Sequence, residues 1–233
     1  MPSMPQYIAE ITGERFLITG DEAKHLFCVM RAAEGDNIKI FDGRGKKFNA
    51  VIKEVAKDIV VGSVISEIAL RPLPYNLTLC FAPVDKSKTE EILDKCTQLG
   101  VSSFLPVITE RTEHDILKKW ENKKERWEQI IIAAVKQCET AFVPRLLAPQ
   151  KFEQALKIPG KTIIAYEKEN SVSLSSAVKG EEKAIKIFIG PAGGFSPREV
   201  EEAVLQGAVL VTLGVNIMRA ETAAIAAAAI ALQ

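Results

Sequence analysis

Two glycine-containing segments near the C-terminus are the parts of the sequence best suited to binding a small molecule. The first, Gly190–Gly194, follows the apolar run Ile187–Ile189. It precedes Ser196, Pro197 and Glu199, which have the pattern of a capping box at the start of a helix. Open α/β sheets bind ligands where a strand ends and a helix begins, and glycines let a ligand approach backbone N–H groups. The spacing fits neither a dinucleotide-binding fingerprint nor a P-loop, and a plain tight turn before a capped helix is equally compatible with it.

The second segment repeats this arrangement closer to the C-terminus. The strand-like run Val209–Leu213 ends at Gly214, and a helical run follows. Arg219, just before that helix, carries the planar donor group of a guanidinium, and the carboxylate of Glu221 can reach backbone or ligand donors. These two side chains are candidates for contact with a bound substrate. The alternative is an arginine–glutamate pair that only caps the last helix.

The first third of the chain is predicted to be mostly β. Short alternating runs are separated by glycine-containing turns, which is typical of a small barrel. One helix, Asp21–Arg31, interrupts them, with Thr19 or Asp21 available as its cap. The predicted strands are Tyr7–Ile11, Asn37–Phe41, Phe48–Val55 and Ile59–Ile68.

A change of pattern marks a second domain. Two prolines within Arg71–Pro74 cannot continue a strand ladder, so we predict domains at 1–72 and 75–233. Strand-like and helical runs then alternate, which predicts an α/β domain whose parallel sheet has helices on both faces. The predicted strands are Asn76–Ala82, Phe104–Ile108, Thr162–Tyr166, Lys186–Gly190 and Val209–Leu213. The predicted helices are Lys88–Leu99, Lys119–Cys138, Pro197–Gln206 and the alanine-rich Glu221–Leu232, which is suited to close packing against another helix or another subunit.

The composition excludes some classes of function. The 233 residues include 30 basic and 30 acidic side chains, so no overall positive field is available to grip nucleic acid, although a local basic face is compatible with this balance. The two histidines and four cysteines lack the spacing of a metal site, and the cysteines lie in apolar runs, as expected for reduced core thiols in a cytoplasmic protein. The N-terminus lacks the pattern of a signal peptide, and the longest apolar stretch is too short to span a membrane.

Several motifs together give the chain a specific family resemblance. The paired segments Ile189–Ser196 (IGPAGGFS) and Leu213–Ala223 (LGVNIMRAETA) resemble the signature of the RsmE family. These proteins are S-adenosylmethionine-dependent methyltransferases of the SPOUT superfamily, and they methylate N3 of a uridine in 16S ribosomal RNA. The resemblance covers nearly the whole chain, and its further motifs are His25–Arg31, Gly35–Asp36, Phe41–Gly45, Lys95–Val101, Pro106, Thr109–Arg111 and Arg126–Trp127.

The resemblance implies a fold, a cofactor and an assembly. The fold would be an N-terminal PUA-like RNA-binding barrel followed by a SPOUT domain with a trefoil knot near its C-terminus. The knotted region would join two copies into a homodimer, and the two glycine segments would hold S-adenosylmethionine through their backbone, without a metal. The implied cofactor-binding residues are Ile189, Gly190, Pro191, Gly194, Leu213, Gly214, Met218, Thr222 and Ala223.

The resemblance also gives roles to charged residues. Uridine N3 is nucleophilic only after it loses its proton, and we expect Arg219 to stabilise the charge that builds on the flanking carbonyl oxygens. Glu221 would orient Arg219 or take the proton. RNA phosphates would bind exposed cations, each of which, taken singly, could equally be a solvated surface charge. The candidates are Arg31, Arg44, Lys46, Lys47, Lys86, Lys88 and Arg111.

Some positions depart from the family pattern. The family usually has Glu at the positions of Ala192 and Gln98 and Arg at that of Asn216, and it usually has an early arginine near the position of Gln6. Its usual Gln-Ser-Gly-Arg run reads Gln137–Thr140 here, without the arginine. A second function therefore stays open, that of a catalytically weakened RNA-binding or ribosome-assembly factor with the same fold.

Overall fold

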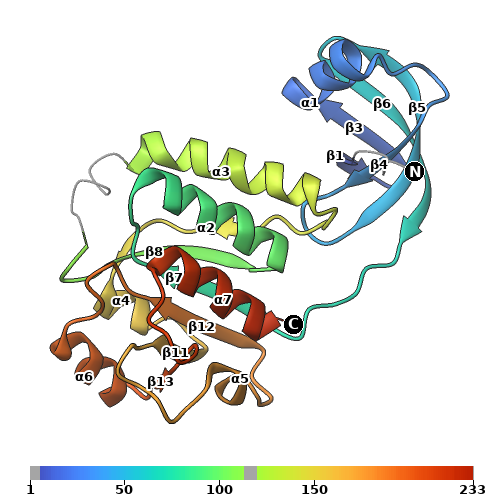
Figure 1. The fold of residues 1–233 in the computed structure, drawn as a ribbon. Helices are drawn as coiled ribbons and strands as arrows, with labels where there is room; N and C mark the ends of the chain where they lie inside the picture. Colours follow the sequence, from blue (N-terminus) through green and yellow to red (C-terminus); the bar gives the residue numbers. More distant parts are fainter. Residues whose placement is uncertain (1–5, 113–119, 233) are drawn as a thin grey trace. The chain divides into compact units, whose positions relative to one another are not determined.

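The computed structural model describes residues 6–112 and 120–232, which form two compact units (Figure 1). The first unit contains residues 1–72 together with the segment 135–143, and the second contains 73–134 with 144–233. Each unit has its own sheet and its own hydrophobic core. The excursion of residues 135–143 into the first unit was not predicted from the sequence.

A curled six-stranded sheet forms the first unit (Figure 1). Its order, β1-β4-β5-β6-β3-β2, is an open path, so the predicted barrel is present as a half-barrel. β1 and β4 are parallel and the other neighbours are antiparallel. Two register irregularities between β5 and β6 add twist, which lets the sheet curl around its core. The strands are β1 (Gln6–Ile8), β2 (Glu10–Thr12), β3 (Arg15–Thr19), β4 (Asn37–Phe41), β5 (Lys47–Ala56) and β6 (Ile59–Ile68).

The strands of this unit differ from the prediction in two details. The expected strand Tyr7–Ile11 is divided at Ala9 into β1 and β2, and these strands lie at opposite ends of the sheet. β3, which was not predicted, pairs with β2 across the turn at Gly13, whose positive φ of 59° suits glycine.

The expected helix at residues 21–31 is also different. α1 (Gly20–Lys24) continues directly into a π-helix, η1 (His25–Met30), which ends at Arg31 in the left-handed region. Only Ala23 and Leu26 are buried on this stretch. The apolar side chain of Phe27 is 44% exposed.

The second unit is built on a parallel sheet of order β10-β8-β7-β12-β11-β13, with β9 paired beside β8. The five longer predicted strands are all present, with bounds within two residues of those expected. β9 and β10, of two residues each, are too short for a periodic signal. The strands are β7 (Asn76–Phe81), β8 (Ser103–Ile108), β9 (Arg145–Leu146), β10 (Gln150–Lys151), β11 (Lys161–Ala165), β12 (Ala184–Ile189) and β13 (Val209–Val211).

Helices cover both faces of this sheet, as the alternation predicted. On one face α4 and α6 share a core with strand residues such as Cys80 and Phe188. The preceding residues, Leu79 and Ile187, point to the opposite face and are fully buried as well. α7 packs against α2, β7 and β12. The helices are α2 (Lys86–Leu99), α3 (Trp120–Gln137), α4 (Phe152–Leu156), α5 (Leu174–Ala177), α6 (Pro197–Leu205) and α7 (Ala220–Leu232); Lys119, the first residue of the predicted third helix, lies outside the described residues.

All four cysteines are free, but they do not all lie in the core. Cys80 and Cys96 are buried, and burial raises the pKa of both thiols. Cys138 is half-buried and Cys28 is exposed, so the expectation of four core thiols was wrong for these two. Within residues 6–112 and 120–232, no three His, Cys, Asp or Glu side chains gather as a metal site would need. In the same ranges no helix has both the length and the apolarity to cross a membrane.

Candidate functional site

The carboxyl edge of the parallel sheet carries both glycine segments. Because β12 and β13 flank β11, their ends lie about two strand spacings, or about 10 Å, apart. The loop that follows β11 contacts the β13 side, since the N–H of Tyr166 donates to Val211 O over 3.0 Å and Ser173 forms a parallel bridge with Thr212. The two segments therefore border one edge of the sheet.

The first glycine segment is a tight loop that leads into α6. The N–H of Gly194 donates to Pro191 O over 2.9 Å, and Gly194 has a φ of 68°, a conformation that favours glycine. The predicted capping box is confirmed. The N–H of Ser196 donates to Glu199 Oε2 over 2.8 Å, and the N–H of Glu199 donates to Ser196 Oγ over 3.3 Å.

Glu199 and Arg111 tie this loop to the loop after β8. The second carboxylate oxygen of Glu199, Oε1, accepts a hydrogen bond from the N–H of Glu110 over 2.8 Å, and the side chain is only 6% exposed. The guanidinium of Arg111 donates to the carbonyl oxygen of Gly193. The sequence had suggested only a helix cap for Glu199 and only RNA for Arg111. Nothing in the sequence predicted this contact between the loops, because a capping box uses only one oxygen of the glutamate carboxylate and does not specify what the other oxygen binds.

Glu167 is a site residue that the sequence did not reveal. A Cβ atom added to Gly194 would lie 3.2 Å from Glu167 Oε1, so this carboxylate rests against the loop backbone. Glu167 follows β11, at the same sheet edge. The loop therefore has one carboxylate close to its peptide groups, together with the carbonyl-bound guanidinium of Arg111.

The second glycine segment leads into α7. Thr212 Oγ1 accepts from the N–H of Gly214 over 3.2 Å and donates to Gly214 O over 2.9 Å. The side chain of Met218 lies beside Gly214, with its methyl carbon 3.7 Å from where a Cβ would be. Thr222 is exposed, whereas Leu213, Met218 and Ala223 are half-buried.

Arg219 and Glu221 lie close to a charged pair at the start of α2. Lys88 Nζ is 2.9 Å from Asp85 Oδ2. This charged hydrogen bond is the main reason that the pKa of Lys88 is raised. The charge of Glu221 raises the pKa of Lys88 further, and that of Arg219 opposes it. Hydrogen bonds from Lys88 and Ser87 lower the pKa of Asp85 to about 2. Arg219 is exposed and Glu221 half-buried, so the arginine is free to meet a substrate.

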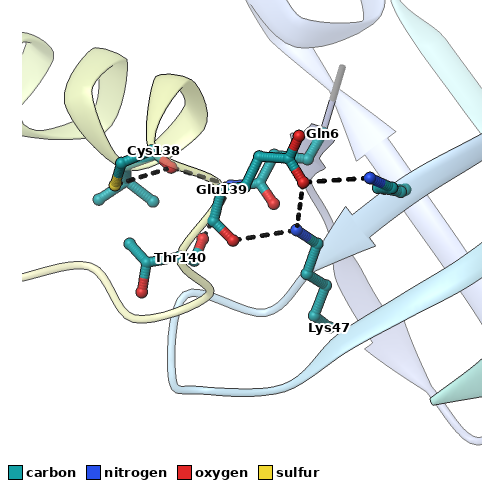
Figure 2. Close-up of polar contacts among 7 residues, drawn as sticks. Gln6, Lys47, Cys138, Glu139 and Thr140 are labelled. Atoms are coloured by element: carbon teal, nitrogen blue, oxygen red, sulfur yellow. Dashed lines mark hydrogen bonds and ion pairs between the residues drawn. The ribbon is translucent and has the colours of Figure 1, made fainter. Parts of the chain in front are cut away.

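The basic residues proposed for RNA are divided between the units. Lys86, Lys88 and Arg111 belong to the second unit, Lys88 paired and Arg111 bound to Gly193 as described. The first unit carries Arg31, Arg44 and Lys46, all exposed. Lys47, expected to extend this basic cluster, is instead 4% exposed and paired with Glu139 (Figure 2).

The positions that depart from the family pattern fall in different places. Ala192 and Asn216 are exposed on the two glycine segments, and Gln98 is exposed on α2. Gln6 and the run 137–140 are neighbours in the first unit, where Gln6 Nε2 donates to Thr140 O over 2.8 Å (Figure 2).

Comparison with known families covers both units. A model described as an RNA methyltransferase domain matches residues 71–232, and one described as an RNA methyltransferase PUA domain matches residues 18–65. The chain is 34% identical to ribosomal RNA small subunit methyltransferase E of Synechocystis, over 94% of this chain and 72% of the relative. It is 33% identical to the protein of the same name from Bacillus subtilis, over 94% and 93% of the two chains.

Solved structures give the same result. A ribosomal RNA small subunit methyltransferase E from Neisseria gonorrhoeae, bound to S-adenosyl methionine, is 29% identical, with a TM-score of 0.86 over 97% of this chain and 96% of the other. A putative methyltransferase from Legionella pneumophila in complex with the same cofactor is 27% identical, with a TM-score of 0.85 over 98% and 97%. From these matches along nearly its entire length, the chain belongs to the RsmE family of small-subunit ribosomal RNA methyltransferases.

Proposed function

We propose that this chain is an S-adenosylmethionine-dependent methyltransferase that modifies N3 of a uridine in 16S ribosomal RNA. The observation that carries the proposal is the capped glycine loop at the carboxyl edge of a parallel sheet, tied to the neighbouring loop by Glu199 and Arg111. Under this proposal, residues 1–72 serve as the PUA-like RNA-binding domain and residues 75–233 as the SPOUT methyltransferase domain. None of the relatives described above supports the alternative of a factor that has lost the chemistry.

The residues at this edge fit the cofactor chemically. S-adenosylmethionine carries a positive sulfur and an uncharged adenosyl group, so its site needs backbone donors and acceptors and nearby negative charge. The loop offers peptide groups of Gly190–Gly194 and, at Gly194, the adjoining carboxylate of Glu167. Leu213 and Met218, half-buried on the second segment, supply apolar surface for a flat ring. We assign the cofactor to Ile189, Gly190, Pro191, Gly194, Leu213, Gly214, Met218, Thr222 and Ala223.

The protein must make uridine N3 reactive. When bound, the cofactor supplies a methyl group that its sulfonium has already activated. Arg219, exposed beside the second glycine segment, stabilises the negative charge that the uracil oxygens gain as the N3 proton leaves. Glu221 orients that guanidinium or takes the N3 proton, and the charges of both side chains act on the neighbouring ammonium of Lys88.

RNA is held by cations on each unit, which are exposed except for the half-buried Lys88. Arg31, Arg44 and Lys46 bind phosphates on the first unit, and Lys86, Lys88 and Arg111 do so on the second. The overall charge balance makes such local contacts necessary, because the chain as a whole has no net charge.

We further propose that the C-terminal region is knotted and joins two copies into a homodimer that works in the cytoplasm. The apolar side chains of Val215 and Ile217, fully and 84% exposed, support a covering partner for the loop before α7. The packing of α7 against α2, β7 and β12 holds this loop on the sheet.

The decisive experiment compares 16S RNA from a strain lacking the gene with RNA from its parent. Mass spectrometry should find one uridine methyl group missing in the deletion strain and restored when the gene returns. Calorimetric titration of the purified protein with S-adenosylmethionine should give one site per chain. Intact uridine methylation in the deletion strain would refute the proposed reaction.

A further inference from the structure

The segment 135–143 belongs to the methyltransferase domain by sequence but to the first unit by structure. Gln6, at the start of β1, holds the segment through its side-chain amide, which donates to Val135 O over 2.9 Å and to Thr140 O over 2.8 Å. Lys136 Nζ is 2.7 Å from Glu22 Oε1. Figure 2 shows the segment lying against the strands of the first unit.

Glu139 is the residue of this segment with the most unusual setting. It has a φ of 58°, a left-handed conformation that is unfavourable for a residue with a side chain. Its carboxylate lies 3.0 Å from Lys39 Nζ and 3.2 Å from Lys47 Nζ, and Lys47 Nζ also donates to Glu139 O over 2.9 Å. Lys47 is almost completely buried, so it depends on this carboxylate as a counter-charge.

The residues after Glu139 pair with the basic turn between β4 and β5. The N–H of Gly45 donates to Ala141 O over 3.1 Å, and the N–H of Val143 donates to Gly43 O over 2.9 Å. Arg44 and Phe142 form the antiparallel bridge between these bonds. The turn that presents the exposed Arg44 and Lys46 is therefore completed by a strand-like partner from a distant part of the chain.

We infer that Glu139 is a positioning residue for RNA binding: its ion pairs with Lys39 and Lys47 fix the segment that shapes the Arg44–Lys46 turn. The inference rests on the proposed function, because it concerns the RNA step of that reaction. Glu139 itself, paired with two lysines, touches no RNA.

The sign of the expected effect separates positioning from simple electrostatics. Glu139→Gln removes one negative charge beside a basic turn, so long-range attraction alone would tighten RNA binding. If the carboxylate positions the turn, the same change weakens RNA binding instead, because Arg44 and Lys46 lose their fixed geometry.

The test uses the full chain and unmodified 16S RNA. For Glu139→Gln we expect the RNA Kd and KM to rise by about threefold or more, and the slope of log Kd against log salt to fall by about 1 for each phosphate that the variant no longer binds. The kcat and the Kd for S-adenosylmethionine should stay at the wild-type values. The matched control is Glu67→Gln on β6, which makes the same charge change on the same unit and should not weaken RNA binding.

A second variant and a second measurement exclude a general loss of folding. Glu139→Gly suits the left-handed backbone and removes the whole side chain, carboxylate included, so it should show the same loss of RNA affinity. Hydrogen exchange at the amides of Gly45 and Val143 should become faster in both variants without RNA. Wild-type RNA affinity or exchange in either variant, or tighter binding, would overturn the inference, whereas a wild-type protein that does not methylate the RNA would refute the proposed function instead.

Discussion

Arg219 is exposed just before α7, and the charges of Glu221 and Lys88 act on the same small region. This setting suits a cation that must reach a substrate and yet stay oriented by a carboxylate. An arginine that only capped a helix would be expected near the C-terminal end of that helix, where the helix dipole favours positive charge, and Arg219 lies at the opposite end.

We predict that Arg219→Ala lowers kcat about a hundredfold or more, the order expected when one electrostatic donor to a developing charge is removed. Transfer of a labelled methyl group to 16S RNA measures kcat, and calorimetry should find an unchanged Kd for S-adenosylmethionine. The matched control is Arg198→Ala on α6, an exposed arginine to which no role is assigned. A kcat near that of the wild type would remove Arg219 from the mechanism.

Lys186 on β12 is a buried cation of a different kind. It is 2% exposed, and its ammonium donates to Leu156 O over 2.8 Å and to Ile158 O, at the end of α4. Burial lowers its pKa from the ordinary 10.5, and the nearby Cys80 opposes this shift. The native state therefore loses this proton at a lower pH than the unfolded chain does.

A pH dependence of stability follows. As the pH rises from the lowered pKa of Lys186 toward 10.5, the unfolded chain binds more protons than the native state, so the free energy of unfolding should rise relative to that of Lys186→Met. Urea unfolding of both proteins, from pH 7 to the highest pH at which they still fold, would measure this change in the free energy of unfolding. The control is the exposed Lys168→Met. Parallel curves for wild type and Lys186→Met would contradict the prediction.

At the scale of elements, the glycine loop before α6 needs a particular backbone conformation and also borders the proposed cofactor site. Gly194 needs a left-handed conformation and also leaves room for Glu167. Gly207, just after α6, shares the conformation, with a φ of 84°, but a Cβ there would meet no atom within 4 Å. Comparing the two glycines therefore separates the effect of the left-handed backbone from the effect of the contact with Glu167.

We predict that Gly194→Ala and Gly207→Ala each destabilise the protein by about 1 kcal/mol, since both force alanine into the left-handed region. Only Gly194→Ala should also weaken the binding of S-adenosylmethionine, because the added methyl group displaces the Glu167 carboxylate. Thermal unfolding and calorimetric titration measure the two effects. Equal cofactor affinity in both variants would exclude Gly194 from the site.

The elements also show what the sequence could predict. The longer strands and helices of the second unit agree with prediction, because their buried faces impose regular periods on many residues. The stretch 20–31 does not, because only Ala23 and Leu26 are buried there and a π-helix exposes the apolar Phe27. In the site, the capping box of Ser196 and Glu199 was readable from local spacing. The contact of Glu167 with Gly194 joins loops far apart in the sequence and left no local signal.

At the scale of the whole molecule, the loop before α7 carries Val215 and Ile217, apolar side chains that are almost completely exposed within one chain. Neighbouring apolar side chains exposed in this way fit a surface that a partner covers. The alanine-rich α7 that follows allows close approach of backbones, as the sequence suggested for contact with another helix or another subunit.

We predict that Ile217→Lys shifts the protein from dimer to monomer, because it places a charge in the proposed apolar contact. Sedimentation at micromolar concentrations would measure the change. The control is Ile65→Lys, an exposed isoleucine on β6 of the first unit, which should leave the mass unchanged. A wild-type protein that sediments as a monomer would exclude the homodimer.

The excursion of residues 135–143 has a consequence for how the protein is made. During translation the strands of the first unit emerge early, yet the carboxylate that neutralises the buried Lys47 belongs to Glu139 and follows much later. At about 5–20 residues per second, the ribosome needs several seconds to supply it. Until Glu139 has been synthesised, the ammonium of Lys47 has no counter-charge, so the nascent half-barrel must leave it in contact with water.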